Sequence, residues 1–426
     1  MKLQFVGSLK SIGSKKVPLV SSRCGYLPIV RHLSSPSYAE RQWFGITGTR
    51  KLGHHSYAIV LARDAGIQLE FSVLQPRPSR HPVGPNSNPF IPGAPRLRKV
   101  LIMKLTPGKL AGLKAVSNNR GVIAAAAMDQ RGSLKKALGT YATDAGLEEF
   151  KINVSEVLTK HASAILLDPE WGLPAAKRRA KGSGLLLAYE KTGYDKTLPG
   201  RLPDLLDVWS VKRLKEAGGD CVKILLYYTI FDDKKINDLK HAWTERIGDE
   251  CKANDIPFFL ELVGYKEGVD EKGAEYAKLK PEVVAKSMEE FTKDRYGVDV
   301  LKVEIPVNLQ FVEGAKSFKG TKAYTKKEAL DHYRAAAGAT NKPFIYLSAG
   351  VSNPEFIEDL EFAAEAGVKF NGVLCGRATW KDGIPIFAEK GAAAFRAWLE
   401  DEGVKNIGNV NNALKAATPW YSIYEV

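Results

Sequence analysis

Short apolar runs alternate with amphipathic stretches along the chain from Gly121 onward. The apolar runs are typical of strands, at residues 121–128, 164–168, 184–189, 221–228, 257–263, 300–307, 343–348 and 372–376. Between and after them, the spacing of apolar residues predicts helices at residues 147–162, 203–218, 235–253, 281–295, 325–338, 353–366 and 390–402. One more helix, at residues 106–119, is expected before the first strand.

The repetition of strand and helix predicts the fold. Eight strands, each followed by a helix in about 300 residues, indicate an α/β chain folded as a (β/α)8 TIM barrel. An open doubly wound sheet is the alternative, but a G-x-G-x-x-G turn is missing after the first strand, where Asp129-Gln130-Arg131-Gly132 stands.

Charged residues interrupt three of the predicted strands. In the strand at 300–307, Lys302 and Glu304 alternate with apolar residues, so both are expected to face the barrel interior. Glu261 and Lys223 interrupt the strands at 257–263 and 221–228 in the same way. Isolated charge in a barrel interior costs several kcal/mol unless it is paired or used, so these residues are candidates for a site.

An interior lysine suits one kind of chemistry in particular. Desolvation lowers the pKa of an ammonium group, and the free amine can then form a Schiff base with a carbonyl substrate. A carboxylate nearby, such as Glu261, can move protons while a carbon–carbon bond is cleaved. A purely structural network of ion pairs remains the alternative, because such networks also bury charge.

The last two predicted strands end in residues suited to an anion. Ser348 and Gly350 lie at the end of the strand at 343–348, and Gly376 and Arg377 lie at the end of the strand at 372–376. In this fold, backbone N–H groups after the seventh and eighth strands commonly bind phosphate, and an arginine can add a bidentate contact. The pair of strand ends therefore predicts a phosphate site.

The formal net charge of +14 is concentrated at the N-terminus. Residues 1–102 carry fifteen Lys and Arg against three acidic residues, whereas residues 103–426 carry 47 basic and 45 acidic residues. We therefore expect two parts: a basic, largely unstructured extension at 1–102 and a barrel at 103–426. The composition of residues 1–39 is typical of an organellar transit peptide, and a nucleic-acid-binding arm is a second interpretation. We favour a third interpretation, in which the true start is Met103 and the preceding stretch is an artefact such as upstream translation, because Thr106-Pro107 is typical of a helix start.

Histidines and cysteines show no metal-binding or disulfide pattern. His161, His241 and His332 fall in predicted helices, away from strand ends, which makes a zinc-dependent reaction a poor fit. Ser348 has no histidine partner in view, and the basic run Lys177–Lys181 is typical of a solvated surface. No apolar run approaches the roughly 20 residues that span a bilayer.

Several longer motifs resemble one family. They are Leu167-Asp168-Pro169-Glu170-Trp171-Gly172-Leu173-Pro174, Ala188-Tyr189-Glu190-Lys191-Thr192-Gly193-Tyr194, Asp299-Val300-Leu301-Lys302-Val303-Glu304 and Asn371-Gly372-Val373-Leu374-Cys375-Gly376-Arg377, together with the Asp129 and Ser348 segments. This pattern resembles the class I tagatose 1,6-bisphosphate aldolases of the lactose-catabolic type. The resemblance covers residues 103–426 and none of 1–102, and the basic run at Lys177–Arg179 departs from it.

The resemblance implies metal-independent cleavage of D-tagatose 1,6-bisphosphate to dihydroxyacetone phosphate and glyceraldehyde 3-phosphate. It implies the Schiff base on Lys302, acid–base catalysis by Glu261, and contacts with substrate hydroxyls and the carbinolamine by the following residues: Asp129, Gln130 and Lys223. Glu304 is expected to contact substrate as well. Ser348, Gly350, Gly376 and Arg377 would bind one phosphate, and Arg131 the other.

Alternatives remain open. Fructose 1,6-bisphosphate is a second expected substrate, and a sulfosugar-phosphate aldolase of the same superfamily would use the same lysine. A non-catalytic regulatory barrel is disfavoured, because the proposed lysine, acid–base and phosphate residues are all present. The expected partners are a phosphorylated ketose and, in a homo-oligomer, further copies of the chain. For the barrel, no cofactor and no nucleic-acid or membrane partner is expected. The expected location is the cytoplasm.

Overall fold

A computed structural model describes residues 46–52, 55–61, 68–73 and 103–425. The chain divides into two units, Met1–Leu97 and Arg98–Val426. The transit-peptide interpretation of residues 1–39 falls outside the described residues.

The larger unit contains a closed parallel barrel, as the sequence predicts. Its strands are β5 (Ile123–Met128), β6 (Ala164–Leu167), β7 (Gly184–Ala188), β8 (Cys221–Tyr228), β9 (Phe258–Gly264), β10 (Val300–Val303), β13 (Phe344–Leu347) and β14 (Gly372–Cys375). Hydrogen bonds between β14 and β5 close the ring. Every predicted strand is present, within a few residues at the ends.

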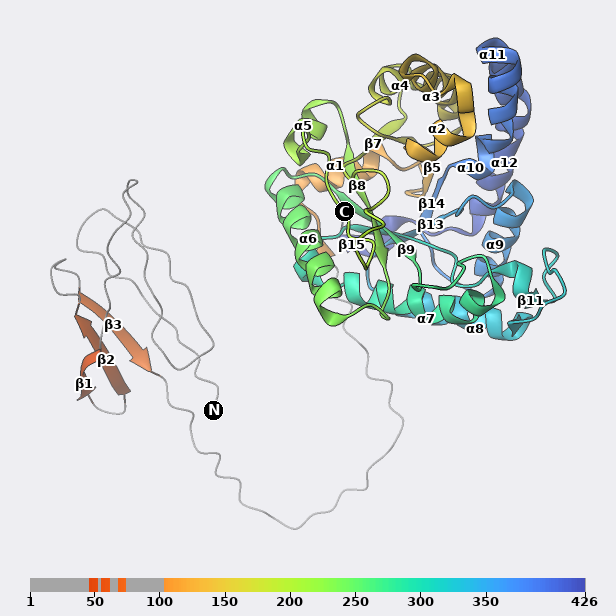
Figure 1. The fold of residues 1–426 in the computed structure, drawn as a ribbon. Coiled ribbons are helices and arrows are strands. Elements are labelled where there is room, and N and C mark those ends of the chain that lie inside the picture. Colours follow the sequence, from red (N-terminus) through yellow and green to blue (C-terminus); the bar gives the residue numbers. More distant parts are fainter. Residues whose placement is uncertain (1–45, 53–54, 62–67, 74–102, 426) are drawn as a thin grey trace. The chain divides into compact units, whose positions relative to one another are not determined.

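Helices form a ring around these strands (Figure 1). They are α2 (Gly132–Leu138), α3 (Asp144–Leu158), α4 (Leu173–Lys177), α5 (Val211–Glu216), α6 (Lys234–Ala253), α7 (Ala274–Phe291), α8 (Lys326–Gly338), α9 (Asn353–Glu365), α10 (Arg377–Trp380), α11 (Ile384–Trp398) and α12 (Val404–Ala413). Helix α12 and the short α2, α4 and α10 are additions to the predicted set. Helix α7 starts seven residues before the predicted start and runs through Pro281, because Tyr276 and Ala277 in its first turn are buried against the barrel.

Apolar side chains form two layers. Ile123, Phe259 and Ile345 belong to a cluster that fills the barrel interior. Their neighbours in sequence, such as Leu260, belong to a larger cluster between the strands and the helices. The period-two alternation therefore assigns each strand residue to the inside or the outside of the barrel.

The N-terminal end of the barrel is closed by the two ends of the larger unit. Helix α1 (Pro107–Ala115) begins one residue after Thr106, as predicted, and Lys109 forms an ion pair with Asp299 at 2.8 Å. From the other end, Trp420 donates from its indole N–H to Ser117 at 2.9 Å. Strand β4 (Met103–Lys104) pairs in parallel with β15 (Tyr424–Glu425).

The smaller unit contains an element that the sequence analysis did not expect. Strands β1 (Ile46–Leu52), β2 (His55–Leu61) and β3 (Gln68–Val73) form an antiparallel sheet. Residues 57–61 and 69–73 are rich in β-branched and aromatic residues, but the surrounding proline-rich segments hide this short signal.

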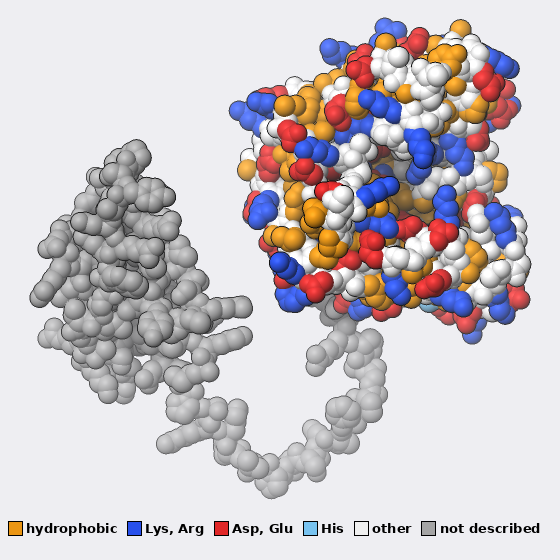
Figure 2. All heavy atoms as spheres, viewed as in Figure 1, with side chains coloured by type: hydrophobic (Ala, Val, Ile, Leu, Met, Phe, Trp, Pro, Cys, Tyr) orange, Lys and Arg blue, Asp and Glu red, His pale blue; other side chains and the backbone are white. Residues whose placement is uncertain are grey.

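The described surface carries both signs of charge. Figure 2 shows Lys and Arg side chains interspersed with Asp and Glu on the face in view, in line with the nearly balanced composition of residues 103–426. None of the helices formed by the described residues is both long enough and apolar enough to cross a bilayer.

Candidate active site

Lys302 lies in the barrel interior, as its alternation with apolar residues along the strand predicts. It is paired in register with Glu261 on the neighbouring strand, so the two side chains leave the barrel wall at one level. The Lys302 Nζ lies 2.8 Å from Glu261 Oε1, and both residues are buried. An amine and a carboxylate thus face each other at the centre of the barrel.

Lys223 holds the second oxygen of the same carboxylate. Its Nζ lies 2.7 Å from Glu261 Oε2, 2.8 Å from Asp129 Oδ2 and 2.8 Å from Glu190 Oε1. The Lys223 side chain has no exposed surface. One ammonium group therefore gathers carboxylates from β9 and from the ends of β5 and β7.

The opposite charges in this cluster offset the cost of removing each of them from water. Burial opposes ionisation of Asp129 and of Glu261, but Lys223 and Lys302 outweigh it, so the pKa of each carboxyl lies below its ordinary value. Burial also opposes the charge of Lys223, and its three carboxylate neighbours raise its pKa well above the ordinary value. Lys223 is therefore a fixed cation. Among the described residues, Lys302 forms an ion pair with one carboxylate, that of Glu261.

Glu190 is a buried residue of this cluster to which the sequence analysis assigned no role. Besides the contact of its carboxylate with Lys223, its main-chain oxygen accepts a hydrogen bond from Arg131 Nη2 at 2.7 Å. Arg131 also pairs with Glu170 at 2.8 Å and is buried. The signal for Glu190 was its place directly after a predicted strand, which it shares with Asp129. The predicted contact of Arg131 with a phosphate remains a prediction.

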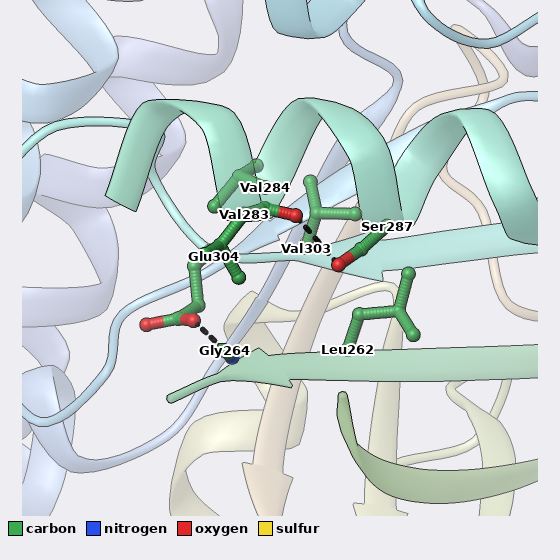
Figure 3. Close-up of a pocket in the computed structure, with 7 residues that line it drawn as sticks. All are labelled: Leu262, Gly264, Val283, Val284, Ser287, Val303 and Glu304. Atoms are coloured by element: carbon green, nitrogen blue, oxygen red, sulfur yellow. Dashed lines mark hydrogen bonds between the residues drawn. The ribbon is translucent and has the colours of Figure 1, made fainter. Parts of the chain in front are cut away.

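Glu304 lies apart from the Lys302 cluster. Figure 3 shows its carboxylate beneath α7, directed toward the backbone N–H of Gly264, which donates to it at 2.7 Å. Lys280 on α7 lies 3.5 Å from its other oxygen. Strand β10 ends at Val303, so the alternation that predicted an inward Glu304 no longer applies. Its contact with substrate stays a prediction.

The ends of β13 and β14 form a cradle around Arg377. The turn Ser348–Val351 is closed by a hydrogen bond from Val351 N–H to Ser348 O, with φ of 48° at Ala349 and 83° at Gly350. A Cβ at Gly350 would lie 2.8 Å from the Arg377 guanidinium carbon, so glycine lets the arginine lie against the turn. Arg377 is exposed and forms no ion pair with any described residue.

Two further groups border this cradle. Lys381, to which the sequence analysis also gave no role, donates to Gly350 O at 2.9 Å. Gln130 lies next to Gly376, where an added Cβ would be 3.4 Å from its amide nitrogen. The predicted residues Ser348, Gly350, Gly376 and Arg377 are thus brought together, next to Gln130.

The basic run and the histidines lie elsewhere. Arg178 pairs with Glu156 on α3, and Arg179 donates to the main-chain oxygens of Ala176 and Ser183. His241 contacts the hydroxyl of Tyr228 at 3.1 Å, and burial lowers its pKa. Within the described part of the chain, no group of His, Cys, Asp and Glu side chains is arranged to hold a metal ion.

Known proteins resemble the chain along the barrel. A family model described as DeoC/LacD family aldolase matches residues 123–382. Tagatose 1,6-diphosphate aldolase 2 of Enterococcus faecalis is 54% identical over 330 residues, which are 76% of this chain and 99% of that protein. Tagatose 1,6-diphosphate aldolase of Staphylococcus haemolyticus is 53% identical over 318 residues, 73% of this chain and 97% of that protein.

A solved structure shares the fold. Fructose-bisphosphate aldolase from Plasmodium falciparum matches with a TM-score of 0.53 at 14% identity, covering 76% of this chain and 98% of that one. At this identity the likeness supports the barrel alone. The family model and the relatives confirm the resemblance in the sequence motifs, and the chain belongs to the DeoC/LacD family of aldolases.

Proposed function

We propose that this aldolase cleaves D-tagatose 1,6-bisphosphate to dihydroxyacetone phosphate and glyceraldehyde 3-phosphate through a Schiff base on Lys302. The observation that carries the proposal is the contact of the Lys302 amine with Glu261 at 2.8 Å, in a barrel whose strand ends also present the exposed Arg377. The substrate comes from the relatives that are 53–54% identical and are named for it.

Lys302 is the better nucleophile of the two interior lysines. Lys223 is held as an ammonium by three carboxylates, and attack on a carbonyl requires a free amine. Glu261 can take the proton of Lys302 and return it, because one of its oxygens is 2.8 Å from that nitrogen. Lys223 meanwhile holds the other oxygen and fixes the orientation of the carboxylate.

The first half of the reaction forms the iminium. The Lys302 nitrogen bonds to C2 of the ketose, the carbonyl oxygen takes up a proton, and the resulting carbinolamine hydroxyl leaves as water with a second proton. Glu261 relays these protons. Asp129 and Gln130, next to the lysine cluster and to the phosphate cradle, hydrogen-bond the carbinolamine and the substrate hydroxyls.

The second half breaks the carbon–carbon bond. A base removes the proton of the C4 hydroxyl, the C3–C4 bond breaks, and its electron pair moves into the iminium to give an enamine and glyceraldehyde 3-phosphate. Protonation of the enamine at C3 and addition of water at C2 then release dihydroxyacetone phosphate and the free lysine.

The phosphate on C1 would lie against Arg377. Its guanidinium offers bidentate hydrogen bonds, and the turn at Gly350 and the Ser348 hydroxyl provide further donors. Lys381 supports the turn through Gly350 O. Anchoring at β13 and β14 directs C2 toward Lys302 on β10, the strand that neighbours β13.

Borohydride trapping tests the proposal. The full chain is incubated with dihydroxyacetone phosphate, reduced, digested and mapped; the adduct is expected on Lys302. Lys302→Met should abolish both adduct and cleavage, and turnover of the parent enzyme should survive a chelator. An adduct on Lys223 would reassign the nucleophile, and chelator-sensitive turnover would defeat the mechanism. Parallel assays with the fructose epimer define the preference at C4.

We also propose that residues 103–426 suffice for this activity and that the enzyme acts in the cytoplasm. The first proposal is supported by the closed barrel of eight strands and by the pairing of β4 with β15, all within residues 103–426. The second is in line with the buried free thiols of Cys221, Cys251 and Cys375. A chain starting at Met103 should match the kcat of the full chain, and fractionation of the source cells tests the location.

A further inference from the structure

Lys151 is a fully buried lysine that lies behind the active site. It projects from α3, and its Nζ contacts three oxygens: Met128 O at 2.8 Å, Gln130 O at 2.8 Å and Asp168 Oδ2 at 2.6 Å. The Lys151 and Asp168 side chains have no exposed surface. A buried ion pair of this kind is weak evidence for stability by itself, so its role has to be sought in what it holds.

The two main-chain oxygens that Lys151 binds belong to the residues on either side of Asp129. Strand β5 ends at Met128, where its ladder with β6 also ends. Beyond that point the ladder no longer holds the main chain, and Lys151 supplies hydrogen bonds in its place. The carbonyl groups of the residues before and after Asp129 are therefore both tied to one ammonium group.

Asp168 extends this support to the following residues. Its Oδ1 accepts hydrogen bonds from the backbone N–H groups of Glu170 at 3.1 Å and Trp171 at 2.8 Å. The Glu170 carboxylate then pairs with Arg131 at 2.8 Å. The segment Asp129–Arg131 is thus held at its main chain by Lys151 and at its last side chain through Asp168.

We propose that Lys151, fixed by Asp168, is a positioning residue that sets the Asp129 carboxylate against Lys223 and the substrate. The proposal rests on the proposed function, in which Asp129 contacts the carbinolamine. A displacement of about 1 Å in such a group can cost on the order of 100-fold in rate. Loss of Lys151 should therefore lower kcat and leave the phosphate cradle, and with it KM, nearly unchanged.

The test uses Lys151→Met alone and together with Asp168→Asn. The double variant removes both buried charges and keeps an oxygen for the N–H groups of Glu170 and Trp171, so it guards against a variant that fails to fold. We expect kcat for tagatose 1,6-bisphosphate to fall about 30-fold in both, with KM within about threefold. Lys240→Met is the matched control. Lys240 is also fully buried and paired with Asp232 at 2.8 Å, but it donates a second hydrogen bond to the Tyr265 hydroxyl and not to the main chain beside Asp129.

A double-mutant cycle separates positioning from a structural role. In an Asp129→Asn background, Lys151→Met should lower kcat by less than about threefold, because the group it positions is already gone. If Lys151→Met lowers kcat as much in that background as in the parent, the proposal is overturned. It is also overturned if the Lys151→Met/Asp168→Asn variant keeps the kcat of the parent, or if Lys240→Met is as slow as Lys151→Met. A parent chain that fails to cleave the sugar bisphosphate would instead overturn the proposed function.

Discussion

Replacing Lys223 by methionine should destabilise the fold far more than the loss of one ordinary ion pair. The Lys223 ammonium touches the carboxylates of Asp129, Glu190 and Glu261 at 2.7–2.8 Å, and all of them are mostly buried. Removing one partner of a buried pair leaves an uncompensated charge and costs about 3–5 kcal/mol. With three carboxylates affected, we expect a loss in the free energy of unfolding at the upper end of that range at pH 7.

The pH dependence of stability should change sign in this variant. In the parent, the pKa values of Asp129 and Glu261 are lowered, so their contribution is complete above the unfolded values near about 4 and is lost only as the pH falls further. Without Lys223, burial should raise the pKa of Asp129, whereas Glu261 keeps its contact with Lys302. Stability is then lost as the pH rises through the raised pKa of Asp129, so the variant should gain stability between pH 7 and pH 5.

Urea denaturation at pH 7 and pH 5 measures both effects. Lys302→Met is the matched control, because Lys302 touches one carboxylate, Glu261, which keeps its contact with Lys223. Lys302→Met should therefore lose less stability and show no gain on acidification. If the two variants lose equal stability at pH 7, or if Lys223→Met is no more stable at pH 5, the electrostatic account of the cluster is refuted.

Three further predictions concern other parts of the barrel. Gly350→Ala should raise KM for the bisphosphate about tenfold in steady-state assays, because φ is 83° there and a Cβ would displace Arg377; an unchanged KM would argue against the cradle. Burial raises the pKa of Asp359 well above its ordinary value, so stability is lost as the pH rises above about 4. Asp359→Asn should therefore gain about 1–2 kcal/mol at pH 8 and almost nothing at pH 4 in denaturation experiments, and equal effects at both would contradict this. Trp420→Ala should lose about 3–5 kcal/mol in the same assay, yet keep its kcat, because Trp420 lies at the end of the barrel away from Lys302.

Strand parity was enough to predict the core of the site. In a closed barrel every strand has one face inside, so a charged residue in an apolar run must either face the interior or break the outer core. The sequence pattern by itself therefore placed Lys223, Glu261 and Lys302 correctly in the barrel interior. The phosphate cradle was predicted from the residue types at the ends of two strands, where the main chain is free to turn.

Parity carried no information about residues outside the strands. Lys151 lies in an amphipathic helix, in the run Phe150-Lys151-Ile152, and only the packing of α3 against the end of β5 shows what its ammonium group binds. Glu304 was expected to face the barrel interior, but β10 ends one residue before it, at Val303, so the alternation along the strand does not reach it. Helix α5 is shorter than predicted, since residues 203–210 are extended or turn backbone that contacts the end of β7 and does not continue the helical pattern.

The pairing of β4 with β15 places the first and last described residues of the larger unit side by side. Adjacent ends of this kind can be joined by a short linker, so the barrel unit is suited to circular permutation. New ends could be opened in the exposed loop at residues 195–198, and the rearranged chain would keep all eight strands and the order of contacts around Lys302.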